Sequence, residues 1–219
     1  MRTLLVPASL LAVGIVPVVA GLARLDGLVT GQATADDARF FDNPLPVTLH
    51  ILAVIPYSLL GALQFVPALR RGAWYRAVGM TLVPLSLIAT LTGLWMAHFY
   101  PWLTGDGEAV YVMRLIVGAA MTLSIVCGVV SLLRHEHAAH GAWMLRAYAL
   151  GMGAGTQVLT HLPWFIFVGG RPDEGSRAVM MGLAWIINAV LAEHVIRTRF
   201  ATRVSATSGR ARPMLLSTT

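Results

Sequence analysis

The sequence predicts an all-α, polytopic membrane protein, a bundle of about six transmembrane helices. Hydrophobic residues make up 57% of the chain and charged residues only 12%, whereas a soluble domain carries about 25% charged residues. The mean hydropathy is +0.71. Several apolar runs approach the roughly 20 residues that a helix needs to cross about 30 Å of hydrocarbon. Because lipid leaves no partner for free backbone groups, we expect these runs to be helices.

Six apolar runs, each bounded by polar segments, give the expected elements in order: Leu4–Ala23, Val47–Leu69, Ala77–Phe99, Val110–Leu133, Ala142–Val168 and Ala178–Ile196. The first run has a short basic start and small residues near its end, so a signal peptide is the alternative interpretation. Its length favours a retained helix. We expect one transmembrane domain over residues 1–199, with a four-helix core from the second to the fifth helix, and a disordered cytoplasmic tail over 200–219.

The segments between the runs mark their ends and their sidedness. A basic turn with Arg70, Arg71 and Arg76 follows the second run, and a histidine-rich turn over 134–140 follows the fourth. Acidic loops follow the third and fifth runs. Arginine is concentrated in the turns after the second and fourth runs and in the C-terminal tail. The positive-inside bias therefore predicts a multi-pass protein of the cell (inner) membrane with both termini in the cytoplasm. This also explains the net charge of +6 without nucleic acid as a partner.

Polar residues at membrane depth are costly and are therefore candidates for function. On the second run His50, Tyr57, Gln64 and Arg71 recur every seven residues, which places them on one stripe because seven residues complete almost two helical turns. The fifth run contains Gly151 and Gly155, whose spacing is typical of close helix packing.

Four residues are expected near the outer face of the membrane: His50, His98, His161 and Arg114. Two axial histidines on facing helices can hold a b-type haem. We therefore predict His98 and His161 as the metal ligands, with His50 as a third ligand or a propionate partner and Arg114 beside a carboxylate or propionate. The alternative is that His50 and His98 lie at the membrane interface, and that Arg114 snorkels or pairs with Glu108.

A second polar set is expected at the inner helix ends, with His140, Arg146 and Arg76 as candidates. The spacing of His135, His137 and His140 is not a standard zinc pattern. Cys127 is the only cysteine, so no disulfide forms within the chain.

Several of these segments resemble a family of bacterial membrane proteins catalogued as domain of unknown function 2306. The resemblance rests on His50, the run Gly61-Ala-Leu-Gln-Phe-Val-Pro67 with Arg70, Arg76 with Gly79, and His140 with Trp143-Met144 and Arg146-Ala-Tyr-Ala-Leu150. It implies the helical membrane fold and no particular activity. Tyr75 stands where the family typically has a histidine, which weakens the case for a second, inner pair of haem ligands.

Three classes of function remain open on the sequence. The first is a redox protein with haem b, exchanging electrons with a quinone or a membrane partner. The second is a small transporter or proton-coupled carrier in which the stripe of the second helix lines a polar path. The third is a non-catalytic membrane subunit bound to a partner protein. No Gly-x-Ser-x-Gly or His-Glu-x-x-His motif indicates an enzyme.

Overall fold

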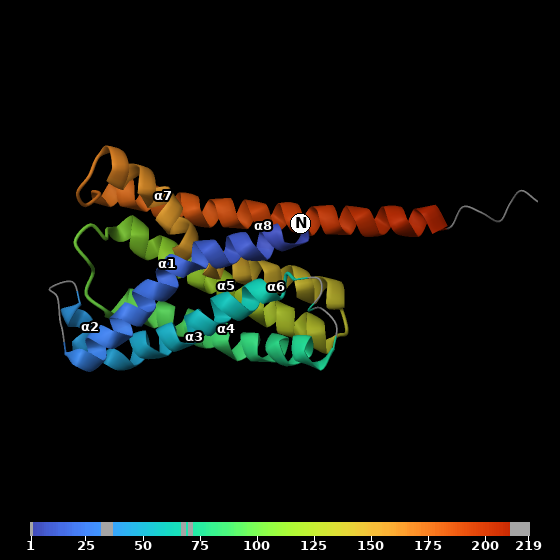
Figure 1. The fold of residues 1–219 in the computed structure, drawn as a ribbon, viewed down its shortest axis with the longest axis horizontal. Helices are drawn as coiled ribbons and strands as arrows, with labels where there is room; N and C mark the ends of the chain where they lie inside the picture. Colours follow the sequence, from blue (N-terminus) through green and yellow to red (C-terminus); the bar gives the residue numbers. More distant parts are fainter. Residues whose placement is uncertain (1, 32–36, 67–68, 70–71, 211–219) are drawn as a thin grey trace, which may run out of the picture.

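The computed structural model describes residues 2–31, 37–66, 69 and 72–210 of the chain, and within them it contains helices and no strand (Figure 1). The helices are α1 (Arg2–Thr30), α2 (Ala38–Asp42), α3 (Pro44–Leu63), α4 (Ala73–Phe99), α5 (Glu108–Leu133), α6 (His137–Gly151), α7 (Gly153–Phe167) and α8 (Glu174–Arg210). In the described part of the chain, five of them contain a stretch long and apolar enough to span a membrane: α1, α3, α4, α5 and α8. The predicted polytopic helical membrane fold is confirmed.

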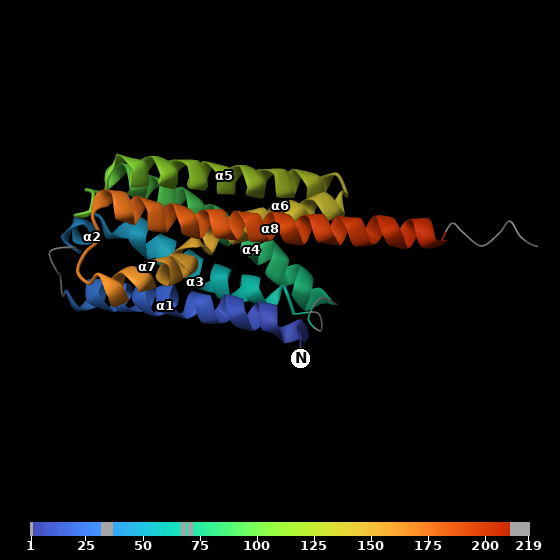
Figure 2. The same cartoon turned by 90° about the horizontal axis from the view of Figure 1, so that it is seen from above.

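The helices form a closed ring of neighbours. In order around the ring, α1 packs on α3, α3 on α4, α4 on α5, α5 on α6, α6 on α8, α8 on α7, and α7 returns to α1. Figure 2 shows the long helices running roughly alongside one another. The predicted core of four helices corresponds to α3, α4, α5 and α6, which are successive neighbours in this ring.

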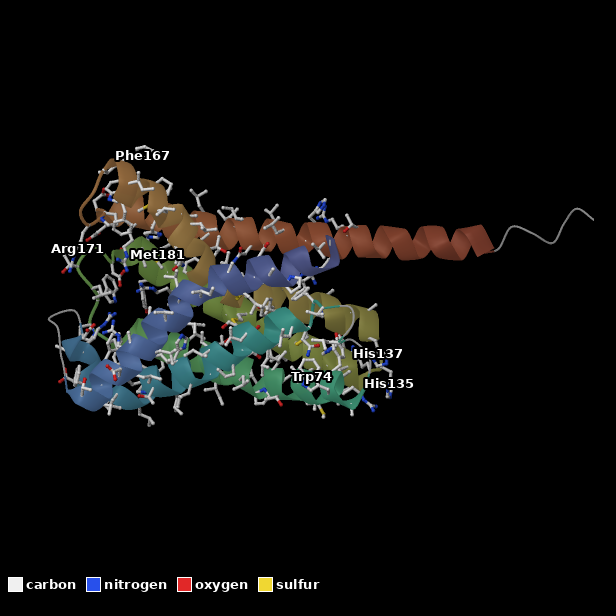
Figure 3. All side chains as sticks on the ribbon, in the orientation of Figure 1. Trp74, His135, His137, Phe167, Arg171 and Met181 are labelled. Atoms are coloured by element: carbon white, nitrogen blue, oxygen red, sulfur yellow. The ribbon has the colours of Figure 1, made fainter. Side chains whose placement is uncertain are left out.

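The bundle has two chemically different ends. Figure 3 shows Trp74, His135 and His137 at one end, which we call the His137 end, and Phe167 and Arg171 at the opposite one. The second end carries α2 and the loop that holds Asp106, and we call it the Asp106 end. Since His137 begins α6 and Phe167 closes α7, these two helices in tandem lead from one end to the other.

The predicted single helix over Ala142–Val168 is two helices of 15 residues each, with a break at Met152. Glycine is the poorest helix former after proline, and Gly151, Gly153 and Gly155 surround the break. They are also needed for packing. A Cβ on Gly153 would lie 2.2 Å from Nε1 of Trp185, and one on Gly155 would lie 2.6 Å from the backbone oxygen of Val13. The packing role predicted for these glycines is confirmed.

Other boundaries differ from the sequence prediction in understandable ways. The helix predicted over Val47–Leu69 ends at Leu63, and Gln64 follows it in a turn. The last helix continues to Arg210, because no proline interrupts the segment after Ile196. The predicted tail over 200–219 therefore begins inside a helix, and residues 211–219 lie outside the described residues.

A buried cluster closes the core between α3, α5 and α6. Its members are Tyr57, Met121, Ile125, Ala147, Tyr148 and Met152. The rings of Tyr57 and Tyr148 meet edge to face with centroids 5.6 Å apart. The Tyr148 hydroxyl donates to the carbonyl of Ser58 at 2.8 Å, so this buried polar group is satisfied without water.

Candidate functional site

The break between α6 and α7 is held by side chains from α7 and α8. The side-chain amide nitrogen of Asn188 donates to the carbonyl of Ala149 at 3.0 Å, in the last turn of α6. Thr156 Oγ donates to the Asn188 side-chain oxygen at 2.9 Å. A helix interrupted at membrane depth leaves backbone groups that neighbouring polar side chains must satisfy. Asn188 therefore binds the end of α6 and the start of α7 at once.

Polar groups continue along α7 toward the Asp106 end. Thr160 Oγ donates to the carbonyl of Met180 on α8 at 2.9 Å. His161 Nδ1 lies 2.7 Å from the carbonyl of Gln157, one turn earlier. Nε1 of Trp164 is buried and has no hydrogen-bond acceptor among the described residues. This face of α7 thus carries several groups that can donate or accept hydrogen bonds within an apolar segment.

His50 lies between α3 and α4. Its Nδ1 is 2.8 Å from the carbonyl of Ala89 and 3.2 Å from the hydroxyl of Thr92. Gly93 leaves room for the ring, because a Cβ there would lie 3.3 Å from Cε1 of His50. His98, in the last turn of α4, is exposed, and its Nδ1 lies 2.9 Å from the Tyr111 hydroxyl.

The three predicted outer histidines therefore have three separate partners. His50 contacts α4, His98 contacts α5, and His161 bonds to its own helix. In the described ranges, histidine, cysteine, aspartate and glutamate form no group of three or more that could hold a metal ion. Haem ligation by the pair His98 and His161 stays a prediction.

Carbonyl partners determine the tautomer of several histidines. A carbonyl only accepts, so Nδ1 of His50, His140 and His161 carries the proton in the neutral ring. His140 shows the same arrangement with the carbonyl of Gly128, at 2.8 Å. In each ring Nε2 is then the nitrogen with a free lone pair, available to accept a proton or a metal.

The predicted stripe on α3 is divided among different environments. His50 faces α4, whereas Tyr57 is buried against Tyr148 of α6. Gln64 lies in the turn after the helix, and Arg71 lies outside the described residues.

Of the inner-end candidates, two bridge helices. Besides the bond of His140 to α5, Arg146 Nε donates to Glu193 of α8 at 2.5 Å, and its Nη2 donates to the second carboxylate oxygen at 3.1 Å. The guanidinium also lies over the Trp143 ring, 4.6 Å from its centroid. Arg76 is exposed near the start of α4.

Asp106 is the centre of an ion network at its end of the bundle. Its side chain is only 2% exposed. Arg114 of α5 binds both carboxylate oxygens, at 2.8 and 3.2 Å, and Arg177 of α8 places Nε 2.9 Å from Oδ1. Arg114 thus pairs with Asp106 and not with Glu108. The loop, α5 and α8 are joined through this one carboxylate.

Sequence reasoning missed Asp106 as the partner of Arg114, and it missed that Arg177 shares this carboxylate. Arg177 is positioned by the start of α8, where Asp173 accepts hydrogen bonds from the backbone N–H and the hydroxyl of Ser176, at 3.0 and 2.7 Å. These bonds lower the pKa of the Asp173 carboxyl. The sequence signal that could have identified Arg177 is its position four residues after Asp173, the aspartate that directly precedes α8.

Arg39 of α2 lies beside the same network. Its Nη1 donates to the carbonyl of Pro101 at 2.9 Å, and its guanidinium lies over the Phe40 ring. Burial lowers the pKa of Arg39, Asp106 opposes this effect, and the neighbouring Arg114, Arg24 and Arg177 lower it further. Arg39 therefore lies within electrostatic range of one carboxylate and three other arginines.

A model of the protein family described as "Predicted membrane protein (DUF2306)" matches residues 47–196, more than half of the chain. No curated protein and no solved structure matches the chain.

Proposed function

This chain belongs to the DUF2306 family of predicted membrane proteins, and we propose that it works as a small proton-coupled carrier in which α7 moves relative to α6. The observation that carries the proposal is the break at Met152, where Asn188 and Thr156 complete the hydrogen bonding of the interrupted segment. Many secondary transporters bind their substrates at interrupted helices near the middle of the bilayer. Hinge positions in such motions are a few residues at element ends.

The bonding pattern at the break supports movement of α7. Asn188 contacts α6 through one hydrogen bond and α7 through another, so exchanging either bond releases one of the two helices from Asn188 while the hydrogen bond of Tyr148 to Ser58 stays in place. Met152 itself adopts a conformation at the edge of the helical region, with φ −75° and ψ 1°. A rotation there changes the direction of α7 while α6 keeps its contacts with α5.

His161 is the proton-carrying group in this proposal. It is the only ionisable side chain between Gly153 and Phe167. Its Nδ1 is engaged by the carbonyl of Gln157, so Nε2 accepts the proton.

The first test is proton flux into proteoliposomes that contain a trapped pH-sensitive dye. We expect wild-type vesicles to acidify faster than protein-free vesicles under an imposed pH gradient. The substitution His161→Ala should reduce this flux at least tenfold, because no other group on α7 titrates. The matched control is His194→Ala, which removes an exposed histidine of α8 and should leave the flux unchanged. Equal flux in wild-type and protein-free vesicles, or in wild type and His161→Ala, would contradict the proposal.

The two hydrogen bonds of Asn188 at the break between α6 and α7 give a second test. We expect Asn188→Ala to reduce the flux while gel filtration still shows a folded monodisperse protein, because the carbonyl of Ala149 and the Thr156 hydroxyl lose their shared partner. The control Thr81→Ala removes a hydroxyl that bonds only within its own helix, to Ala77. A folded Asn188→Ala protein with full flux would show that the break is structural only.

Haem binding is the second candidate, favoured by the orientation of His161. A histidine that donates Nδ1–H to a carbonyl presents Nε2 as a ligand in a fixed direction, as metal-bound histidines usually do. His98 has its Nδ1 on Tyr111 and would present the second nitrogen. Such a haem b would exchange electrons with a quinone or a protein partner.

An optical spectrum tests the haem candidate directly. Protein expressed with a supply of haem should show a Soret band that is lost in His161→Ala and retained in His194→Ala. Wild-type protein without a Soret band or haem iron would rule the candidate out.

A further inference from the structure

The Asp106 end contains more arginine charge than its buried carboxylate can neutralise. Arg114 and Arg177 both contact Asp106, and Arg39 donates to the carbonyl of Pro101 in the loop that carries Asp106. The charge of Arg39 is within electrostatic range of Asp106, Arg114 and Arg177, so three guanidinium groups lie in the neighbourhood of one carboxylate. Charges removed from water are stable only when they are paired. These three guanidinium groups carry two more positive charges than the one carboxylate, and within the described residues no direct contact joins Arg39 to Asp106.

Three other acids in the described segments at this end have contacts of their own. Asp37 forms an ion pair with Arg24, and Asp173 accepts the two hydrogen bonds from Ser176. The carboxylate of Glu174 lies against Gly107, where a Cβ would be 2.5 Å from Oε2. None of these contacts supplies a carboxylate to Arg39.

Among the described residues, the direct contacts of Arg39 are uncharged. They are the carbonyl of Pro101 and the ring of Phe40. Its Nε is buried and has no acceptor within the part of the chain that the structure describes. Arg114 and Arg177 keep 28% and 23% of their side chains exposed, so the network is open to solvent on one side.

We propose that Arg39, with Arg114 and Arg177, forms a binding site for a phosphate group. The planar guanidinium fork suits bidentate contact with phosphate oxygens. The site lies where the membrane-spanning helices α4, α5 and α8 begin or end, which is the depth of lipid headgroups. The phosphate therefore comes either from solution or from the headgroup of an anionic phospholipid. The site does not depend on carrier activity.

The test uses the full chain in a maltoside detergent, which contains no phosphate. We expect inorganic phosphate or a short-chain phosphatidylglycerol to raise the melting temperature above that in chloride of equal ionic strength, because a ligand of the native state stabilises it. The substitution Arg39→Gln should abolish this shift and leave both partners of Asp106 in place. The control Arg134→Gln removes an exposed arginine after α5 and should keep the full shift.

The outcomes separate the two sources and the failure of the proposal. A shift with inorganic phosphate supports a soluble ligand, and a shift with phosphatidylglycerol alone supports a headgroup. Arg39→Lys keeps the charge but loses the fork, so we expect the half-saturating concentration to rise roughly tenfold, or about 1.4 kcal/mol. No shift beyond that in chloride, or equal shifts in wild type and Arg39→Gln, would overturn the site.

Discussion

Replacing Asp106 with asparagine is expected to lower the free energy of unfolding by about 3 kcal/mol, the cost of leaving buried charges without their partner. The carboxylate is 2% exposed and is shared by Arg114 and Arg177. Asparagine keeps the shape of the side chain but removes its charge, so both guanidinium groups lose their counter-ion at once. The loss can be measured by titration with a denaturing detergent in mixed micelles.

The control for this substitution is Asp42→Asn. Asp42 is exposed at the end of α2, where a surface substitution costs less than about 0.5 kcal/mol. A double-mutant cycle between Asp106→Asn and Arg114→Gln should also show strong coupling, because the second substitution removes one of the two stranded charges. Equal stability of the Asp106→Asn and Asp42→Asn proteins would mean that the ion network contributes little.

The second large effect is expected for Gly61→Ala in the middle of the core. A Cβ on Gly61 would lie 2.2 Å from Cε2 of Tyr148, whose ring is confined by Tyr57 and Phe65. The Tyr148 ring must therefore move. We expect this movement to break the hydrogen bond of its hydroxyl to the Ser58 carbonyl and to disturb its packing against Tyr57 and Phe65. Overpacking of a core typically costs about 1–3 kcal/mol, and the lost buried bond adds about 1 kcal/mol. We therefore expect destabilisation of about 3 kcal/mol in the same unfolding assay.

Gly79→Ala is the matched control, because Gly79 is also a helical glycine but has nothing within 4 Å of the added carbon. Alanine favours helix over glycine by about 1 kcal/mol, so this variant should be neutral or slightly more stable. If Gly61→Ala lowers the free energy of unfolding and Gly79→Ala does not, the loss at Gly61 is due to packing. A stable Gly61→Ala protein would show that Tyr148 adjusts without cost.

The overall fold could be predicted because bilayer physics constrains it strongly. Length and apolarity located α1, α3, α4, α5 and α8, and the confirmed spans follow from those properties alone. The break at Met152 could not be predicted, because the glycines around it also fit a continuous helix that packs closely. Two contacts distinguish the broken helix from a continuous one. Gly155 packs closely against the backbone of Val13, and Asn188 donates a hydrogen bond to the carbonyl of Ala149. Both depend on a helix distant in sequence.

The candidate site was predictable by residue type but not by partner. His161 was expected to have a functional role at membrane depth, yet depth alone did not indicate that its Nδ1 bonds to its own helix. Arg114 was expected beside a carboxylate or propionate, with snorkelling or a pair with Glu108 as the alternatives, and its partner in the structure is Asp106. This aspartate lies in a tight turn just before α5, where its N–H donates to the carbonyl of Leu103 at 2.8 Å.

The closed ring of helices has a consequence for biosynthesis. α1 is made first, but its second neighbour, α7, lies more than a hundred residues later in the chain, and α7 in turn packs on α8, which is made last. While the chain is being inserted, α1 can pair only with α3, and its remaining face contacts lipid or the insertion machinery. Native assembly therefore finishes only after translation has delivered α8, and a chain that stops after α6 leaves the bundle open beside α1.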